Sequence, residues 1–176
     1  RRNYDSLFEL LDMAGERNLR VSVVLLGAFK KAYSEGILEK CRVYQRKFNN
    51  LHFYHEMVVD QPEFDSVIRR SQFLWLPLQP VSLISDGVPE QYGQSTSSVN
   101  IADAIRHAKP FFAPAWLQVE SPLEKSCIRY ESVADIITIM EQLSGAAYTA
   151  IQANAYEASL HFTKERIIAR NEELFT

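Results

Sequence analysis

The chain has 176 residues, of which 47% are hydrophobic and 11% aromatic, so it can build the core of one domain or slightly more. Its formal net charge is −3, with acidic and basic residues mixed along the chain, which gives no electrostatic reason to expect binding to nucleic acid. No apolar run reaches the roughly 18 residues needed to span a bilayer. No signal peptide is visible at the start either, so we expect a globular, cytoplasmic protein.

Predicted helices and strands alternate along the chain. Apolar residues at positions 4, 7, 8 and 11 share one helical face, which predicts a first helix with Gly15 as its C-cap. Continuous apolar runs then predict strands that are buried on both faces. These predicted strands cover residues 21–26, 51–54, 73–78, 111–113 and 126–130. Further helices are predicted over 29–44, from the start signal at 60–63, and over 96–107, 133–143, 145–160 and 163–174.

This alternation predicts the α/β class, with a Rossmann-like, doubly wound parallel sheet of about five to six strands and helices on both faces. Such a domain normally starts with a strand, whereas the first predicted element here is a helix, so we expect one strand ahead of Arg1. The chain also begins without Met, which suggests a fragment. We expect the Rossmann-like domain to cover residues 1–144 and C-terminal helices packed on it to cover residues 145–176.

Several common ligand-binding motifs are missing from the sequence. A dinucleotide site would need Gly-x-Gly-x-x-Gly after the first strand, but Gly27 stands there by itself, and no P-loop follows. No Asp-x-Asp pair can hold a metal-bound diphosphate, and His52 and His55 are interpreted as ordinary strand-end residues. Cys41 and Cys127 lack metal-ligand spacing, so we expect reduced, buried thiols. The sequence therefore predicts no metal site and makes a Rossmann oxidoreductase the least favoured class.

The segment 85–110 carries the strongest candidate for a binding site. Hydroxyl residues that include Ser95, Ser97 and Ser98 follow a buried strand and lead into a predicted helix. Ligands of parallel α/β units bind at the carboxyl end of a strand, where the next helix offers unpaired N–H groups and a partial positive charge. Such a turn suits a diphosphate, and Asp103 is placed to accept hydrogen bonds from a ribose diol. The alternative is that the serines only cap the helix and that Asp103 is solvated.

Five segments of the chain, read together, look like a known set of motifs. They are Arg2-Asn3-Tyr4-Asp5, Val23-Val24-Leu25-Leu26-Gly27, residues 50–56, Glu90-Gln91-Tyr92-Gly93 and residues 103–110. In this order they resemble the C-terminal, nucleotide-sugar-binding half of the GT-B fold glycosyltransferases of the retaining, group 1 type. The resemblance covers nearly the whole chain.

The resemblance implies roles for individual residues. Arg2 falls where the family has a lysine that contacts the donor diphosphate, and Asp103 falls on the glutamate that binds the ribose hydroxyls. Glu90 falls on the glutamate that reaches the donor sugar, and Tyr92 and Gly93 lie in the loop that faces sugar and phosphate. Glu90 and Asp103 are thirteen residues apart, more than the family's usual spacing. Either this loop carries an insertion or its serines have taken over phosphate binding.

The resemblance implies the donor-binding half of a metal-independent glycosyltransferase, whose substrate is a UDP- or GDP-linked sugar and which needs no other cofactor. The catalytic residues stay unassigned, and residues 1–176 are expected to be inactive without the N-terminal acceptor-binding domain. The resemblance also implies a role in polysaccharide biosynthesis, and it allows the full-length protein to associate peripherally with a membrane. Two alternatives remain open: a non-catalytic GT-B-like binding or regulatory module, and a nucleotide-sugar epimerase of the same architecture.

Overall fold

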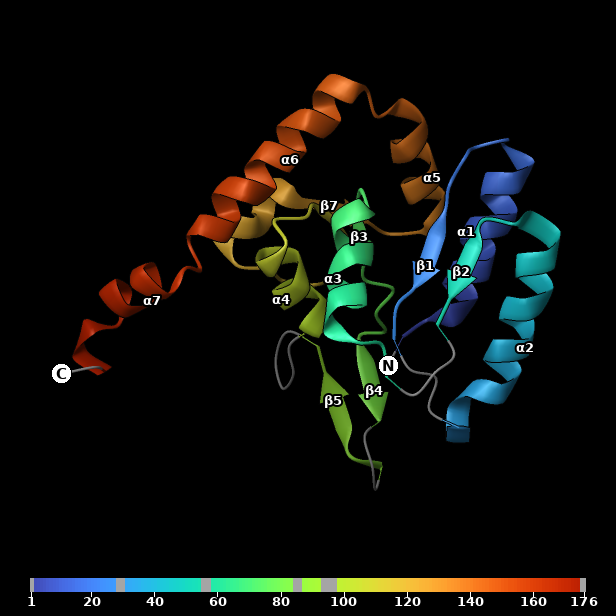
Figure 1. Cartoon of the computed structure of the whole chain (residues 1–176), viewed down its shortest axis with the longest axis horizontal. Coiled ribbons are helices and arrows are strands. Elements are labelled where there is room, and N and C mark those ends of the chain that lie inside the picture. Colours follow the sequence, from blue (N-terminus) through green and yellow to red (C-terminus); the bar gives the residue numbers. More distant parts are fainter. Residues whose placement is uncertain (1, 28–30, 55–57, 84–86, 93–97, 175–176) are drawn as a thin grey trace. The chain divides into compact units, whose positions relative to one another are not determined.

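The computed structural model of the chain describes residues 2–27, 31–54, 58–83, 87–92 and 98–174 (Figure 1). The predicted α/β class is confirmed, since helices alternate with short strands that form small parallel sheets. The chain divides into two compact units. One unit is formed by residues 3–71, and the other by residues 72–176 together with the first two residues.

The unit of residues 3–71 holds a two-stranded parallel sheet and three helices. Its strands pair in register, with Val24 opposite His52, and Figure 1 shows them as blue and cyan arrows. Its elements are α1 (Tyr4–Glu16), β1 (Val23–Leu25), α2 (Lys31–Phe48), β2 (Leu51–Phe53) and α3 (Gln61–Arg70). The start of α3 is as predicted, because the Asp60 side chain accepts the Glu63 N–H at 3.3 Å and Pro62 lies in the first turn.

Helix α1 continues past the C-cap that the sequence predicts. Its C-cap is Arg17, and Gly15 lies inside the last turn, so the prediction for Gly15 is wrong. The glycine has a packing reason, because a Cβ built on it would lie 2.7 Å from Cε1 of Phe48. The absence of a side chain therefore lets the end of α2 approach α1 closely.

A polar seam joins α1 and α2. The Asp12 carboxylate accepts hydrogen bonds from Lys47 Nζ at 2.8 Å and from the Tyr44 hydroxyl at 2.5 Å. These bonds, that of Lys47 foremost, hold the pKa of Asp12 below its usual value. The same carboxylate raises the pKa of Tyr44 to about 12. Lys47 also lies 4.5 Å from the centre of the Phe48 ring, so one cation holds a carboxylate and an aromatic face together.

The unit that begins at residue 72 is built on a three-stranded parallel sheet. The strand order is β3-β6-β7, with Phe111 opposite both Leu74 and Cys127. A separate antiparallel hairpin, β4–β5, follows β3 in the chain. The strands are β3 (Leu74–Trp75), β4 (Val81–Leu83), β5 (Pro89–Gln91), β6 (Phe111–Pro114) and β7 (Cys127–Tyr130). The helices are α4 (Val99–Arg106), η2 (Ser121–Ser126), α5 (Val133–Gln142), α6 (Gly145–Leu160), α7 (Lys164–Arg170) and η3 (Glu172–Leu174).

The core of this unit is centred on β6, whose four residues are all buried. One cluster joins Leu76, Phe111 and Ala104 of α4 with Ala158 of α6. The Tyr130 hydroxyl donates a 2.8 Å hydrogen bond to the Leu76 carbonyl, which ties the ends of β3 and β7 together. This core holds α4 and α6 against the sheet.

The predicted sheet of five to six strands differs from what the described residues form. Their sheets have two and three strands, each inside one unit. The strand predicted over 73–78 shrinks to Leu74–Trp75, because Pro77 cannot donate to a ladder and the Leu78 N–H bonds back to Leu76 at 2.9 Å. The expected long strand thus ends in a tight turn.

The two cysteines are free, as the sequence predicts. Cys41 is buried and Cys127 is half-buried. Burial raises the pKa of each thiol to about 11. Within the described ranges, no helix is long and apolar enough to cross a membrane.

Candidate functional site

The N-terminus of α4 is the first part of the candidate site. The helix begins at Val99, three residues later than predicted, and Ser98 is its N-cap. Ser98 is only 7% exposed, and its side chain makes no capping hydrogen bond. The first turn of α4 contains no acidic residue, so no carboxylate within it offsets the positive end of the helix dipole. These features leave the helix start suited to an anion.

Arg2 reaches the same helix start from the beginning of the chain. Its guanidinium donates a 3.0 Å hydrogen bond to Oδ1 of Asn100, in the first turn of α4. Its backbone forms an antiparallel bridge with Leu78, just after β3. A guanidinium has five N–H donors, so the bond to Asn100 leaves donors for a second acceptor. Arg2 therefore brings a cation to the first turn of α4, at the carboxyl end of β3.

Asp103 lies on α4, three residues after Asn100. Residues at this spacing share one helical face, so Asp103 lies one turn deeper on the side that Arg2 contacts. Its side chain is half-buried. The structure thus brings three of the predicted residues, Arg2, Ser98 and Asp103, to the first two turns of one helix.

Glu90 and Tyr92 belong to the hairpin that precedes this helix. Glu90 is half-buried on β5, where its cross-strand partner is Ser82 of β4. The Tyr92 N–H donates to the Pro80 carbonyl at 3.2 Å, which closes the base of the hairpin. The Tyr92 ring packs on the cluster that Ile101 and other residues of α4 also contact. The hairpin base and α4 therefore rest on one shared core. Gly93, Ser95 and Ser97 lie outside the described residues.

The two residues Ala108 and Lys109, which follow α4, have an unusual backbone angle and an unusual burial. Ala108 has a φ of 49°, which lies in the left-handed region that glycine favours. Lys109 follows it and is buried, and burial lowers the pKa of its ammonium group. The chain therefore turns directly after α4 at a non-glycine residue in the left-handed region.

A shallow hollow of about 410 Å³ is a competing candidate in the same unit. It lies at the carboxyl ends of β6 and β7, where parallel sheets commonly bind ligands. Its lining includes Ala115, Arg129, Tyr130, Asp135, Thr138 and Ile139.

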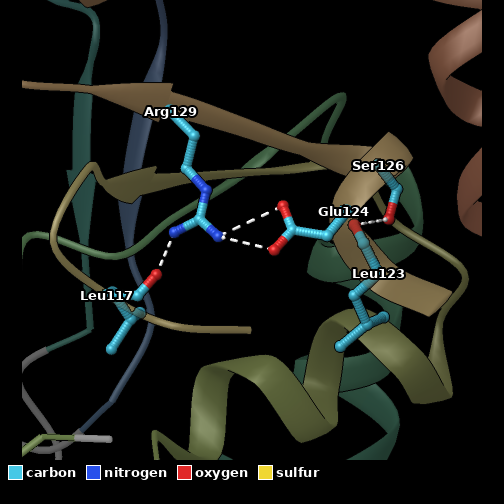
Figure 2. Close-up of polar contacts among 5 residues, drawn as sticks. All are labelled: Leu117, Leu123, Glu124, Ser126 and Arg129. Carbon is cyan, nitrogen blue, oxygen red and sulfur yellow. Dashed lines mark hydrogen bonds and ion pairs between the residues drawn. The ribbon is translucent and has the colours of Figure 1, made fainter. Parts of the chain in front are cut away.

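The Arg129 and Asp135 side chains of this hollow are already bonded within the protein. Figure 2 shows the Arg129 guanidinium between the Leu117 carbonyl and the Glu124 carboxylate. The two carboxylate oxygens of Glu124 lie 3.1 and 3.2 Å from Nη2 of Arg129. Asp135 accepts the N–H groups of Ser132 and Glu131, both at 2.9 Å, and these bonds lower its pKa. These contacts hold the start of α5 and the turn after β6. We therefore place the candidate site at α4.

In the part of the chain that the structure describes, no three His, Cys, Asp or Glu side chains gather in a group that could hold a metal ion. His52 is exposed on β2, and His55 is outside the described residues.

Sequence reasoning missed two residues near the candidate site. Asn100, which orients Arg2, had no distinguishing signal besides its position in the first turn of a helix. Ser82 did have a signal, since Val81-Ser82-Leu83 followed by Asp86-Gly87 is a strand leading into a turn that favours hairpins.

No protein-family model matches this chain, and no curated protein matches its sequence.

Proposed function

We propose that this chain is the donor-binding half of a metal-independent, cytoplasmic glycosyltransferase, which holds the diphosphate of a UDP- or GDP-linked sugar at the start of α4. The observation that supports this proposal is the Arg2 guanidinium, which is 3.0 Å from Asn100 in the first turn of a helix whose first turn has no acidic residue. The finer fold assignment, a Rossmann-like sheet of about five to six strands, belongs to the same proposal.

The proposed chemistry divides binding between three groups. The free N–H groups of the α4 start and the Arg2 fork bind the diphosphate, since both are donors that match phosphate oxygens. Asp103, one turn deeper, accepts hydrogen bonds from the ribose hydroxyls. When the sugar leaves, negative charge grows on the diphosphate, and Arg2 and the helix dipole stabilise it without a metal ion. The acceptor binds a further domain.

Calorimetric titration of the chain with UDP, GDP and ADP tests this proposal. We expect at least one nucleotide to bind with a Kd tighter than about 1 mM, which corresponds to roughly 4 kcal/mol. Arg2→Ala should weaken that binding about tenfold or more, because it removes charge-assisted hydrogen bonds to phosphate. Arg106→Ala is the matched control, since Arg106 is exposed in the last turn of the same helix. Failure of all three nucleotides to bind, or equal losses in both variants, would contradict the proposal.

A further inference from the structure

The hairpin β4–β5 buries a serine on one face and exposes a valine on the other. Side chains alternate along a strand, so Ser82, Glu90 and Tyr92 share one face, and Val81 and Gln91 share the other. Ser82 is only 5% exposed, whereas Val81 is 51% exposed. A two-stranded hairpin on a protein surface normally turns its valines inward and its serines outward. Ser82 and Glu90 thus lie on the buried face, where polar side chains are uncommon unless they are hydrogen-bonded.

The Ser82 hydroxyl is short of a hydrogen bond on this face. Its Oγ is buried and has no hydrogen-bond partner in the described part of the chain. Buried hydroxyl groups are almost always bonded, because burying one without a partner is unfavourable. Glu90 lies directly opposite, and its Oε2 atom is also buried. The face thus presents a donor hydroxyl beside a carboxylate acceptor.

The position of this face connects it with the candidate site. Tyr92, two residues after Glu90 on the same face, packs on the cluster that α4 also contacts. The hairpin face that carries Ser82 is therefore turned toward the core on which α4 rests. A hydroxyl and a carboxylate side by side match a sugar hydroxyl, which accepts a bond from one and donates a bond to the other.

We propose that Ser82, together with Glu90, binds a hydroxyl group of the donor sugar and so sets the preference for the sugar. This inference rests on the proposed function, and it adds Ser82 as a specificity residue. Ser82 binds the sugar portion, so it contributes to the affinity for a nucleotide sugar and not to that for the bare nucleotide.

The test compares the wild-type chain with Ser82→Ala on two pairs of probes, UDP with UDP-glucose and GDP with GDP-mannose. We expect Ser82→Ala to leave the Kd of the nucleotide unchanged within about twofold. The quantity of interest is the ratio of the nucleotide Kd to the nucleotide-sugar Kd. In the pair that the wild-type chain binds more tightly, Ser82→Ala should lower this ratio at least about fivefold. Val81→Ala is the control for disturbance of the hairpin, since it truncates the opposite, exposed face, and it should change neither affinity.

Thermal melting of Ser82→Ala without ligand provides an independent readout. A hydroxyl that the protein itself leaves unbonded can be removed without loss, so the melting temperature should stay the same or rise. A clear fall would show that the hydroxyl bonds within the protein and would overturn the inference. An unchanged sugar advantage in Ser82→Ala would also overturn it while leaving the proposed function intact. If the wild-type chain binds none of the four probes, the proposed function fails, and this inference fails with it.

Discussion

The contact between Gly15 and Phe48 predicts an unusual response to a helix-stabilising substitution. Glycine to alanine inside a helix normally stabilises a protein, because alanine has less conformational freedom to lose on folding. At Gly15, however, the added Cβ would lie 2.7 Å from Cε1 of the Phe48 ring. Carbon atoms in contact prefer about 3.5–4.0 Å, so the ring or the helix must move.

The magnitude follows from two opposing effects. The propensity gain is at most about 1 kcal/mol and is smaller near a helix end. Overpacking typically costs about 1–3 kcal/mol. The Phe48 ring is not free to retreat, because its centre lies 5.7 Å from that of Tyr44 and 4.5 Å from Lys47 Nζ. We therefore expect Gly15→Ala to lower the free energy of unfolding by about 1 kcal/mol.

Urea denaturation followed by circular dichroism measures this change, and Gly36 supplies the control. Gly36 is in the middle of α2, and a Cβ built there would have no atom within 4 Å. Gly36→Ala should accordingly raise the unfolding free energy by about 0.5–1 kcal/mol. In a Phe48→Ala background, Gly15→Ala should lose its destabilising effect. The reasoning would be refuted if Gly15→Ala were as stabilising as Gly36→Ala in the otherwise wild-type chain.

Two further substitutions test the polar contacts of the core and the α1–α2 seam. Since the folded-state pKa of Asp12 is depressed, its bonds to Lys47 and Tyr44 stabilise the fold above about pH 4 and are lost as the pH falls through the folded-state pKa. Asp12→Asn should thus reduce the loss of unfolding free energy on acidification by less than about 1 kcal/mol. If the variant loses as much stability in acid as the wild type, the Asp12 bonds do not stabilise the fold. Tyr130→Phe removes a 2.8 Å bond to the Leu76 carbonyl, which still accepts the Leu78 N–H, so it should cost about 1 kcal/mol in urea denaturation. No measurable loss would mean that this bond is not formed.

Local signals made several elements predictable from the sequence. Asp60 and Pro62 mark the start of α3 within three residues. The helical spacing of the apolar residues in α5 likewise predicts that helix from its own sequence. Strand lengths depended on backbone hydrogen bonds that the hydrophobic pattern does not reveal. The strand predicted over 73–78 ended early because the Leu78 N–H turned back to Leu76, which periodicity cannot show.

The start of α4 was predictable to within a few residues, whereas the side-chain contacts around it were not. The hydroxyl-rich run before an apolar helical pattern located the start of α4, and Ser98 is its N-cap. The hairpin was missed because Glu90 and Tyr92 were interpreted as loop residues, although the Asp86-Gly87 pair after an alternating run is a turn signal. The approach of Arg2 to Asn100 spans 98 positions in the chain, and no local pattern encodes such a pairing.

The two native cysteines, one buried and one half-buried, give the chain a practical advantage for spectroscopy. Burial raises the pKa of both thiols to about 11, so far fewer of them are ionised at pH 7 than at an ordinary surface cysteine. Maleimide dyes react with the ionised form, so a cysteine introduced on the surface would be labelled in strong preference to Cys41 and Cys127. Val81 is a suitable position, because it is exposed on the hairpin face opposite Ser82. A fluorophore there could report nucleotide-sugar binding in the otherwise native chain.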